Sequence, residues 1–178
     1  MPEHRFRHVV GVARAGGRLA AAHGAPASSA RVAGLLHDVA RHWQAAELLV
    51  YARDHALSVS PPEQAAPVLL HARVGADIAR REFGIHDPGI LSAIVSHTVA
   101  RPGMSVLEKC VYLADSVEPS RGFRDSLGLF RLALRDLDRA FFECVAISIR
   151  YLAERRVPVA DETVKVYDEM VQRYGEGS

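Results

Sequence analysis

Cysteine is scarce in this 178-residue sequence, which contains only Cys110 and Cys144. The two residues do not form a CxxC pair, and their spacing therefore excludes a thiolate zinc site. Two reduced thiols in the core of a cytoplasmic protein are the simplest interpretation. Cysteine is thus not expected among the ligands of any metal ion.

Long apolar runs are also missing, because none reaches the roughly 18 residues of a transmembrane helix. The first residues, MPEHRFRHVV, lack the apolar segment of a signal peptide. The formal net charge is only +1 at pH 7, so no bulk electrostatic field favours nucleic acid or an acidic membrane. We therefore expect a cytoplasmic protein whose partners include neither nucleic acid nor a membrane.

Alternating β-branched residues, the usual signal of a β-strand, are rare as well, and the pattern in their place is helical. Apolar residues recur at steps of three and four, and alanine, leucine, arginine and glutamate dominate. Hydrophobic residues make up 49% and charged residues 24% of the chain, as is ordinary for a globular domain. The sequence therefore predicts a single all-α domain over residues 1–178.

Turn and capping residues divide the chain into helices. Gly84 suits the C-terminal end of one helix, and Asp87 with Pro88 suits the N-cap and first position of the next. Ser105 begins an S-x-x-E capping box, and prolines exclude a helix from the loop at residues 58–62. The predicted helices span about residues 3–23, 28–41, 44–56, 66–83, 88–97, 105–115, 125–155 and 161–174.

Imidazoles and carboxylates occupy several positions on the apolar faces of these helices. His71, for example, precedes Val74 and Ile78 by three and seven residues, which places it on the inward stripe. A lone inward histidine is more often a hydrogen-bonded core residue, and an inward aspartate can cap a helix or pair with an arginine. The inward candidates are His8, His37, Asp38, His71, His97 and Asp115. Five further histidines lie in polar contexts and are expected to be solvated: His4, His23, His42, His55 and His86.

Burying six such groups in one bundle requires mutual compensation, which divalent metal ions supply. Four imidazoles and two carboxylates, without a thiolate, suit Fe, Mn, Ni, Co or Zn. Six ligands exceed the needs of one tetrahedral zinc site, so we expect two metal ions bridged by the two oxygens of Asp38. Adjacent residues of a regular helix point about 100° apart, so the ions must lie beside the helix that carries His37 and Asp38. Gly34 leaves space for the close approach of another helix or of a substrate.

The order of these residues, H…HD…H…H…D, resembles that of the HD-domain metal-dependent phosphohydrolase superfamily. The HD pair alone is a weak signal, but the ordered set of six is much more specific. The similarity is greatest to one bacterial branch, the YqeK-type symmetrical dinucleoside-tetraphosphate hydrolases, and covers nearly the whole chain. The stretches that carry it are RFRHVVGVA (5–13), AGLLHDVAR (33–41), LLHARVGA (69–76), ILSAIVSHT (90–98), RPGMSVLEK (101–109), YLADSVEPSR (112–121) and ALRDLDRA (133–140).

This resemblance implies an α-helical HD fold around a two-metal centre, with divalent or mixed-valence ions that are often iron. It also implies hydrolysis of diadenosine tetraphosphate at its centre to two ADP, by attack of a metal-bridging hydroxide on phosphorus. One ion would be bound by His8, His37, Asp38 and Asp115, and the other by Asp38, His71 and His97.

Negative charge accumulates on the phosphoryl oxygens in such a reaction, so positive groups near the ligand motifs are candidate substrate-binding residues. They are Arg5, Arg41, Arg101 and Arg121. The alternative for each is a solvated surface residue or a salt bridge. Thr98 could donate to a phosphate oxygen or hold a ligand in place, and Glu118 could accept a hydrogen bond from an imidazole or orient Arg121. Asp38 and Arg41 are the expected catalytic residues.

Two positions depart from the family pattern. Arg41 stands where lysine is frequent, and Ala100 stands where glycine is usual. A planar guanidinium replaces a point charge in the first case, and the second could narrow the pocket or change a turn. These departures bear on the substrate range more than on metal binding.

Other interpretations stay open at this point. The protein could be another HD-type phosphohydrolase that acts on nucleoside monophosphates or cyclic nucleotides. It could also be a non-catalytic nucleotide-binding module, although loss of ligands would mark that state and all six are present. A purely structural helical bundle is the third alternative. Apolar surface on the last two helices could support a homodimer.

Overall fold

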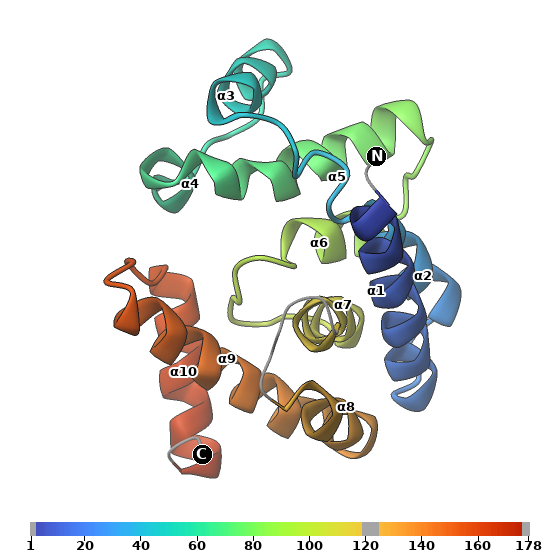
Figure 1. Cartoon of the computed structure of the whole chain (residues 1–178), viewed down its shortest axis with the longest axis vertical. Helices are drawn as coiled ribbons and strands as arrows, with labels where there is room; N and C mark the ends of the chain where they lie inside the picture. Colours follow the sequence, from blue (N-terminus) through green and yellow to red (C-terminus); the bar gives the residue numbers. More distant parts are fainter. Residues whose placement is uncertain (1–2, 119–124, 176–178) are drawn as a thin grey trace.

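The computed structural model describes residues 3–118 and 125–175, and every regular element in these ranges is a helix. This confirms the all-α prediction. The helices are α1 (Glu3–Ala22), α2 (Ala27–Leu36), α3 (Ala45–Asp54), α4 (Pro61–Ala65), the 3-10 turn η1 (Pro67–Leu69), α5 (Leu70–Glu82), α6 (Pro88–Val95), α7 (Val106–Val117), α8 (Ser126–Arg135), α9 (Leu137–Glu154) and α10 (Asp161–Tyr174) (Figure 1).

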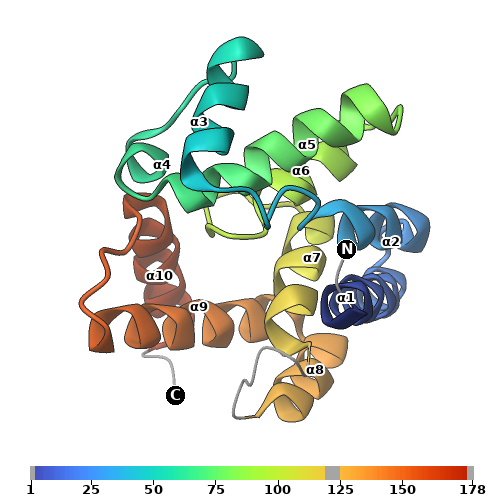
Figure 2. The ribbon, with the colours of Figure 1, turned by 45° about the horizontal axis from the view of Figure 1, so that its top comes forward.

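Helix α7 is the centre of the main core. Its apolar side chains Val111 and Leu113 are fully buried, and α1, α2, α6, α8 and α9 all contact it. Helices α9 and α10 lie on the opposite side of α7 from α1 and α2 (Figure 2). The Thr163 hydroxyl of α10 donates to the Ala100 carbonyl at 3.1 Å, which ties the last helix to the chain between α6 and α7. The C-terminal helices therefore complete the same bundle.

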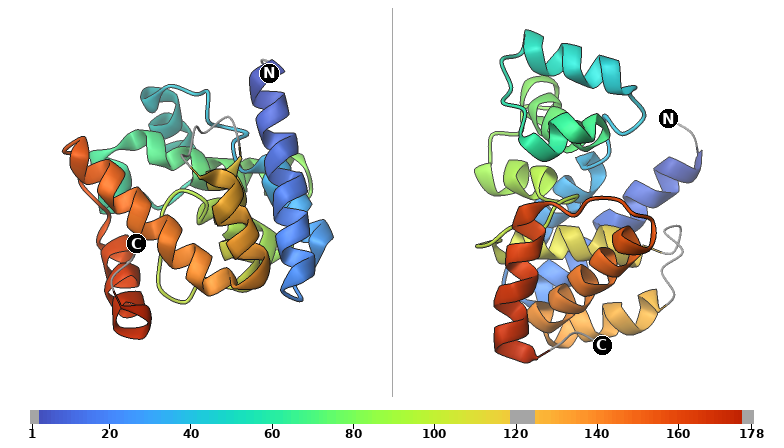
Figure 3. Two further views of the ribbon diagram at one scale, coloured as in Figure 1. Left: turned by 60° about the horizontal axis from the view of Figure 1, so that its bottom comes forward. Right: turned by 90° about the vertical axis from the view of Figure 1, so that its left-hand side faces the viewer.

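A second, smaller apolar cluster joins α3 to one face of α5. Leu48 and Ala52 of α3 pack with Leu70, Val74 and Ile78 of α5, apart from the main core. Helices α3 and α4 accordingly project from one end of the molecule (Figure 3). Because Ala76 and Ala79 of α5 pack into the main core, this helix connects the two clusters.

The predicted helix over residues 28–41 is shorter in the structure, since α2 ends at Leu36. Residues 37–42 then form tight turns, in which backbone N–H groups bond to carbonyls three residues earlier. At Gly34 a Cβ atom would lie 2.8 Å from the Ala13 backbone, so this glycine lets α1 cross α2 closely. The close approach expected at Gly34 is thus made by a helix.

Two other predicted helix boundaries are wrong. The segment 125–155 is two helices, because Asp136 adopts extended backbone and accepts a bond from the Arg139 N–H as the N-cap of α9. The helix expected over 66–83 begins only at Leu70, and the short helix α4 occupies part of the expected loop. A proline at position 61 is tolerated because it stands at the first position of a helix. The caps at Asp136 and Ser60 explain the division of the segment 125–155 and the presence of α4.

The expected capping signals are present elsewhere. Gly84 follows the end of α5 with a φ of +65°. The Asp87 carboxylate accepts from the N–H groups of Gly89 and Ile90 at the start of α6. Ser105 and Glu108 form the predicted capping box of α7. Among the helices in the described part of the chain, none is both long and apolar enough to cross a membrane.

Candidate metal centre

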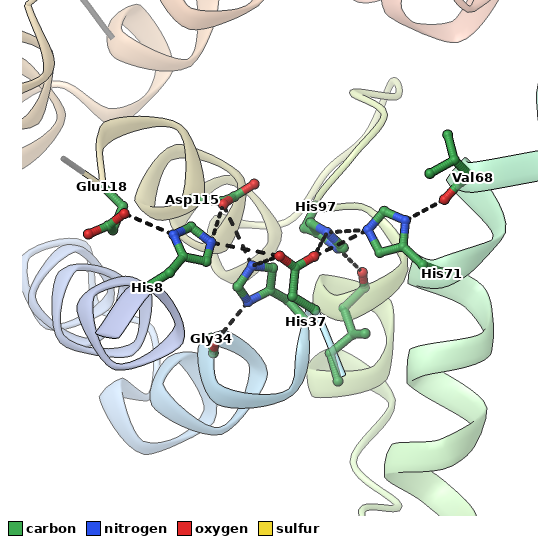
Figure 4. A network of polar contacts seen from close by, with 10 residues as sticks. His8, Gly34, His37, Val68, His71, His97, Asp115 and Glu118 are labelled. Atoms are coloured by element: carbon green, nitrogen blue, oxygen red, sulfur yellow. Dashed lines mark hydrogen bonds and ion pairs between the residues drawn. The ribbon is translucent and has the colours of Figure 1, made fainter. Parts of the chain in front are cut away.

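The structure brings the six inward candidates together from five segments of the chain. His8 lies on α1, His71 on α5 and Asp115 on α7, while His37 and Asp38 follow α2 and His97 follows α6. The labelled imidazoles all point into the space between these elements (Figure 4). His37 and Asp38 both reach this space although they are adjacent, since they stand in the turns after α2.

Three of the imidazoles are held in the same way by backbone. Each donates its Nδ1–H to the carbonyl oxygen three residues earlier, which leaves the Nε2 lone pair directed at the cluster. The pairs are His37 with Gly34 at 2.8 Å, His71 with Val68 at 2.5 Å and His97 with Ile94 at 2.7 Å. The fourth imidazole, that of His8, donates Nδ1–H to the Glu118 carboxylate at 2.9 Å.

The two oxygens of Asp38 face different pairs of imidazoles. Oδ1 lies 3.3 Å from His71 Nε2 and 3.5 Å from His97 Nε2. Oδ2 lies 3.6 Å from His37 Nε2 and 3.8 Å from His8 Nε2. Asp38 therefore stands between two halves of one cluster, as the bridging hypothesis requires.

Asp115 joins only one of these halves. Its Oδ1 lies 3.0 Å from His8 Nε2 and 3.6 Å from His37 Nε2. The groupings that could hold metal ions among the described residues are His8–His37–Asp38, His37–His97–Asp115 and Asp38–His71–His97. Apart from the second grouping, which takes His97 from the other side, one half has two imidazoles and two carboxylates, and the other has two imidazoles and the shared carboxylate.

The distances between these nitrogen and oxygen atoms suit shared metal ions better than they suit hydrogen bonds within the cluster. His37 Nε2 is buried and makes no hydrogen bond, because its nearest carboxylate oxygens lie 3.6 Å away. The Nε2 atoms of His71 and His97 lie 3.2 Å apart, and both rings already use Nδ1–H as a donor. Two ligands bound at right angles, each about 2.1 Å from an ion, are about 3 Å apart. Two facing lone pairs repel each other unless a cation lies between them.

Burial and neighbouring imidazoles set the charge states of the cluster. Burial acts to raise the pKa of Asp38, but the contacts with His71 and His97 and the charge of His37 outweigh it and hold the pKa well below its ordinary value. Burial lowers the pKa of His97. An ionised carboxylate is the protonation state in which Asp38 can bind metal ions.

Two of the expected phosphate-binding arginines lie near the ligands without ion pairs. Arg5 is half-buried on α1, one turn before His8, and its buried Nη1 atom makes no hydrogen bond. Arg41 is half-buried in the turns after Asp38, and its guanidinium has no ion pair or hydrogen bond to any residue that the structure describes. Both groups are therefore available to an anion.

Arg101 is already engaged and does not join the cluster. Its guanidinium binds the Glu108 carboxylate and donates to Ser96 Oγ at 3.3 Å and Ser92 Oγ at 3.2 Å. Thr98 is half-buried directly after His97. The remaining candidate, Arg121, lies outside the described residues.

Glu118 and Glu108 have roles that the sequence left open or did not show. Of the two alternatives for Glu118, the structure shows the hydrogen bond from an imidazole, that of His8. Glu108 was expected only as a capping residue. Its second oxygen also accepts from Ser92 Oγ at 2.8 Å and Ser96 Oγ at 2.9 Å. The spacing of these serines, four residues apart on α6 and at its C-cap, was the available signal in the sequence.

The histidines outside the cluster differ in their exposure. His4, His42 and His86 are exposed, as expected. His23 is half-buried and hydrogen-bonds the Ala133 carbonyl at 2.6 Å, and His55 stacks on Tyr51 with ring centroids 3.9 Å apart. The expectation of solvated side chains is therefore wrong for these two, because α8 and α3 pack against them.

Comparison with known proteins agrees with this geometry. The model of the HD domain family matches residues 5–120, which include all six clustered residues. A protein of Bacillus subtilis (strain 168), named bis(5'-nucleosyl)-tetraphosphatase, symmetrical, is 36% identical over 96% of this chain and 91% of its own length. A protein of the same name from Halalkalibacterium halodurans is 34% identical, again over 96% of this chain and 91% of its own length.

A solved structure shows the same fold. It is the crystal structure of a predicted HD superfamily hydrolase involved in NAD metabolism from Clostridium acetobutylicum. The two structures superpose with a TM-score of 0.90 at 29% sequence identity, over 97% of this chain and 92% of the other. From the family match, these relatives and the clustered histidines and aspartates together, we conclude that the chain belongs to the HD domain family, in its branch of symmetrical bis(5'-nucleosyl)-tetraphosphatases.

Proposed function

We propose that this protein hydrolyses dinucleoside tetraphosphates, with diadenosine tetraphosphate as substrate, symmetrically to two ADP. The observation that carries the proposal is Asp38, whose two oxygens face two separate pairs of imidazoles in a chain whose relatives are named for this reaction. In a symmetrical cut, water bonds to one of the two central phosphorus atoms. The bond from that phosphorus to the central bridging oxygen breaks, and the second ADP leaves.

The proposed centre holds two metal ions, for which iron is our first choice and Mn, Ni, Co or Zn are chemically acceptable. The ligands of one ion would be His8, His37, Asp38 and Asp115, and those of the other Asp38, His71 and His97. When bound, such a pair of cations supplies a water of lowered pKa and positive charge beside the phosphoryl oxygens.

The chain's own residues position and neutralise the substrate. The backbone carbonyls behind His37, His71 and His97 keep the Nε2 lone pairs aimed at the centre before substrate arrives. Arg5 and Arg41 can each bind non-bridging phosphate oxygens through a planar guanidinium fork. In the proposed site, Thr98 donates a hydroxyl proton to a phosphate oxygen, and Arg121 adds a further positive charge.

The test is product identification with anaerobically purified protein of known metal content. We expect two ADP from diadenosine tetraphosphate in water enriched in ¹⁸O, with the label in one ADP of each pair. ATP plus AMP would contradict the symmetrical cut. Efficient hydrolysis of AMP or a cyclic nucleotide, with the tetraphosphate left intact, would instead identify another HD-type phosphohydrolase.

A further inference from the structure

The two halves of the cluster differ in the group that stands behind the imidazoles. His37, His71 and His97 donate to neutral backbone carbonyls, whereas His8 donates to a carboxylate, Glu118 Oε2, at 2.9 Å. The Glu118 side chain is only 11% exposed. Among the residues that the structure describes, only the half that contains His8 therefore has a negative charge behind a ligand.

The contact between Glu118 and His8 depends on a glycine in α1. Gly11 stands one turn after His8, and a Cβ atom at this position would lie 2.9 Å from Glu118 Cγ and 3.1 Å from its Oε1. Glu118 itself follows the end of α7, three residues after Asp115. The absence of a side chain at Gly11 thus lets this carboxylate lie against α1 and reach His8.

A carboxylate acceptor and a carbonyl acceptor act differently on an imidazole. Both fix the ring orientation, but the carboxylate also makes Nε2 more basic and stabilises positive charge on its far side. The half with His8 already has the larger negative charge, from Asp115 and one oxygen of Asp38. The other half has only the second oxygen of Asp38.

We propose that Glu118 is a positioning residue that makes the half formed by His8, His37 and Asp115 the tighter of two metal positions. This inference rests on the metal centre of the proposed function. The first ion binds in this half, and the second binds more weakly beside His71 and His97. Glu118 acts through His8 and does not touch the ion.

The test is titration of metal-free protein with Mn²⁺ alone, followed by calorimetry and by the EPR signal of free Mn²⁺. We expect the wild type to bind two ions in a tight and a weak step. Glu118→Gln keeps the size of the side chain and removes its charge, so it weakens the tight step by about 10–100-fold. The weak step changes by less than about twofold. An unchanged tight step, or equal weakening of both steps, would overturn the proposal.

A double-mutant cycle with Gly11 separates this effect from general damage. Gly11→Ala displaces the Glu118 side chain, so it weakens the tight step as Glu118→Gln does. In a Glu118→Ala background the same Gly11→Ala change has no further effect on binding, because no carboxylate remains to be displaced. If the two substitutions weaken the tight binding step additively in the double variant, the proposed contact is contradicted.

A third variant identifies the half to which the tight step belongs. His71→Ala removes a ligand of the weak position only, so one binding step remains. That step must still weaken when Glu118→Gln is added; if it does not, the assignment is wrong. Because no nucleotide is present, the outcome is independent of hydrolysis. Wild type that binds Mn²⁺ in this way but leaves diadenosine tetraphosphate intact would refute the proposed function alone.

Discussion

At the scale of single residues, Asp38 is the group on which the proposed centre depends most. Its two oxygens face the two halves, and the pKa of its carboxyl is held well below the ordinary value despite burial. The sequence identified this residue and predicted that it bridges two metal ions. It did not show which oxygen faces which imidazoles, because that depends on how α1, α5 and α6 pack around the turns after α2.

We predict that Asp38→Ala loses metal and activity together, since both ions lose a ligand. Turnover of diadenosine tetraphosphate should fall by more than about 100-fold, and the metal content should fall below the two ions per chain of the wild type. Elemental analysis and product chromatography measure the two quantities. Asp54→Ala, at an exposed aspartate on α3, is the matched control. A variant that keeps two ions and full turnover would show that Asp38 does not bridge.

Arg41 provides a residue-scale prediction for the substrate. Because its guanidinium makes no ion pair or hydrogen bond to the residues that the structure describes, Arg41→Ala should keep both metal ions. Loss of a charged contact to phosphate should lower kcat/KM by about 10–100-fold. Arg41→Lys should retain more of it, since the positive charge remains. Steady-state kinetics with unchanged constants in Arg41→Ala would remove this residue from the site.

At the scale of elements, the carboxylate of Glu108 connects α7 to the end of α6, next to His97. It accepts hydrogen bonds from the Ser105 backbone N–H and from the hydroxyl groups of Ser92 and Ser96, and it forms an ion pair with Arg101. Burial acts to raise the pKa of Glu108, but these bonds outweigh it and the pKa lies below its ordinary value. This connection therefore stabilises the helix end from which His97 reaches the cluster.

Glu108→Gln should lower the free energy of unfolding at neutral pH by about 2–4 kcal/mol, because a buried carboxylate with several donors is lost. The folded pKa lies below the ordinary value of 4.5, so the contribution of the charge is present above pH 4.5 and is lost as the pH falls through the folded pKa. The gap between wild type and variant in urea denaturation should thus narrow in acid. Glu162→Gln, on the exposed side of α10, is the control, and a gap that does not depend on pH would contradict the assignment.

At the scale of the whole molecule, the centre is the place where five segments and both apolar clusters meet. Its ligands come from α1, α5 and α7 and from the chain after α2 and α6. Helix α5 carries His71 and also connects the small cluster around α3 to the main core. Ions that bind here join five segments that lie far apart in the sequence.

Metal removal should therefore lower the Tm of the whole protein. At a free ion concentration 100 times the dissociation constant, binding stabilises the folded state by about 2.7 kcal/mol per ion. Thermal melts with chelator and with added Mn²⁺ measure the shift. In Asp38→Ala the same addition should leave Tm nearly unchanged. A wild-type Tm that does not respond to Mn²⁺ would argue against an ion in the core.

Two whole-molecule expectations stay predictions. A homodimer through the last two helices is one, and the exposed apolar side chains there include Tyr151 on α9 and Val164 on α10. The cytoplasmic location is the other.

The sequence by itself determined the helical class, most helix ends and the identity of the six clustered residues. These follow from local signals, namely the period of the apolar residues, the caps at Asp87 and Ser105, and the order of the H and D motifs. Only the tertiary structure decided the carboxylate behind His8, the space at Gly11 for Glu118 and the engagement of Arg101 by Glu108. Each of these contacts joins groups from different elements of the fold, and the distance between such groups depends on packing rather than on local sequence.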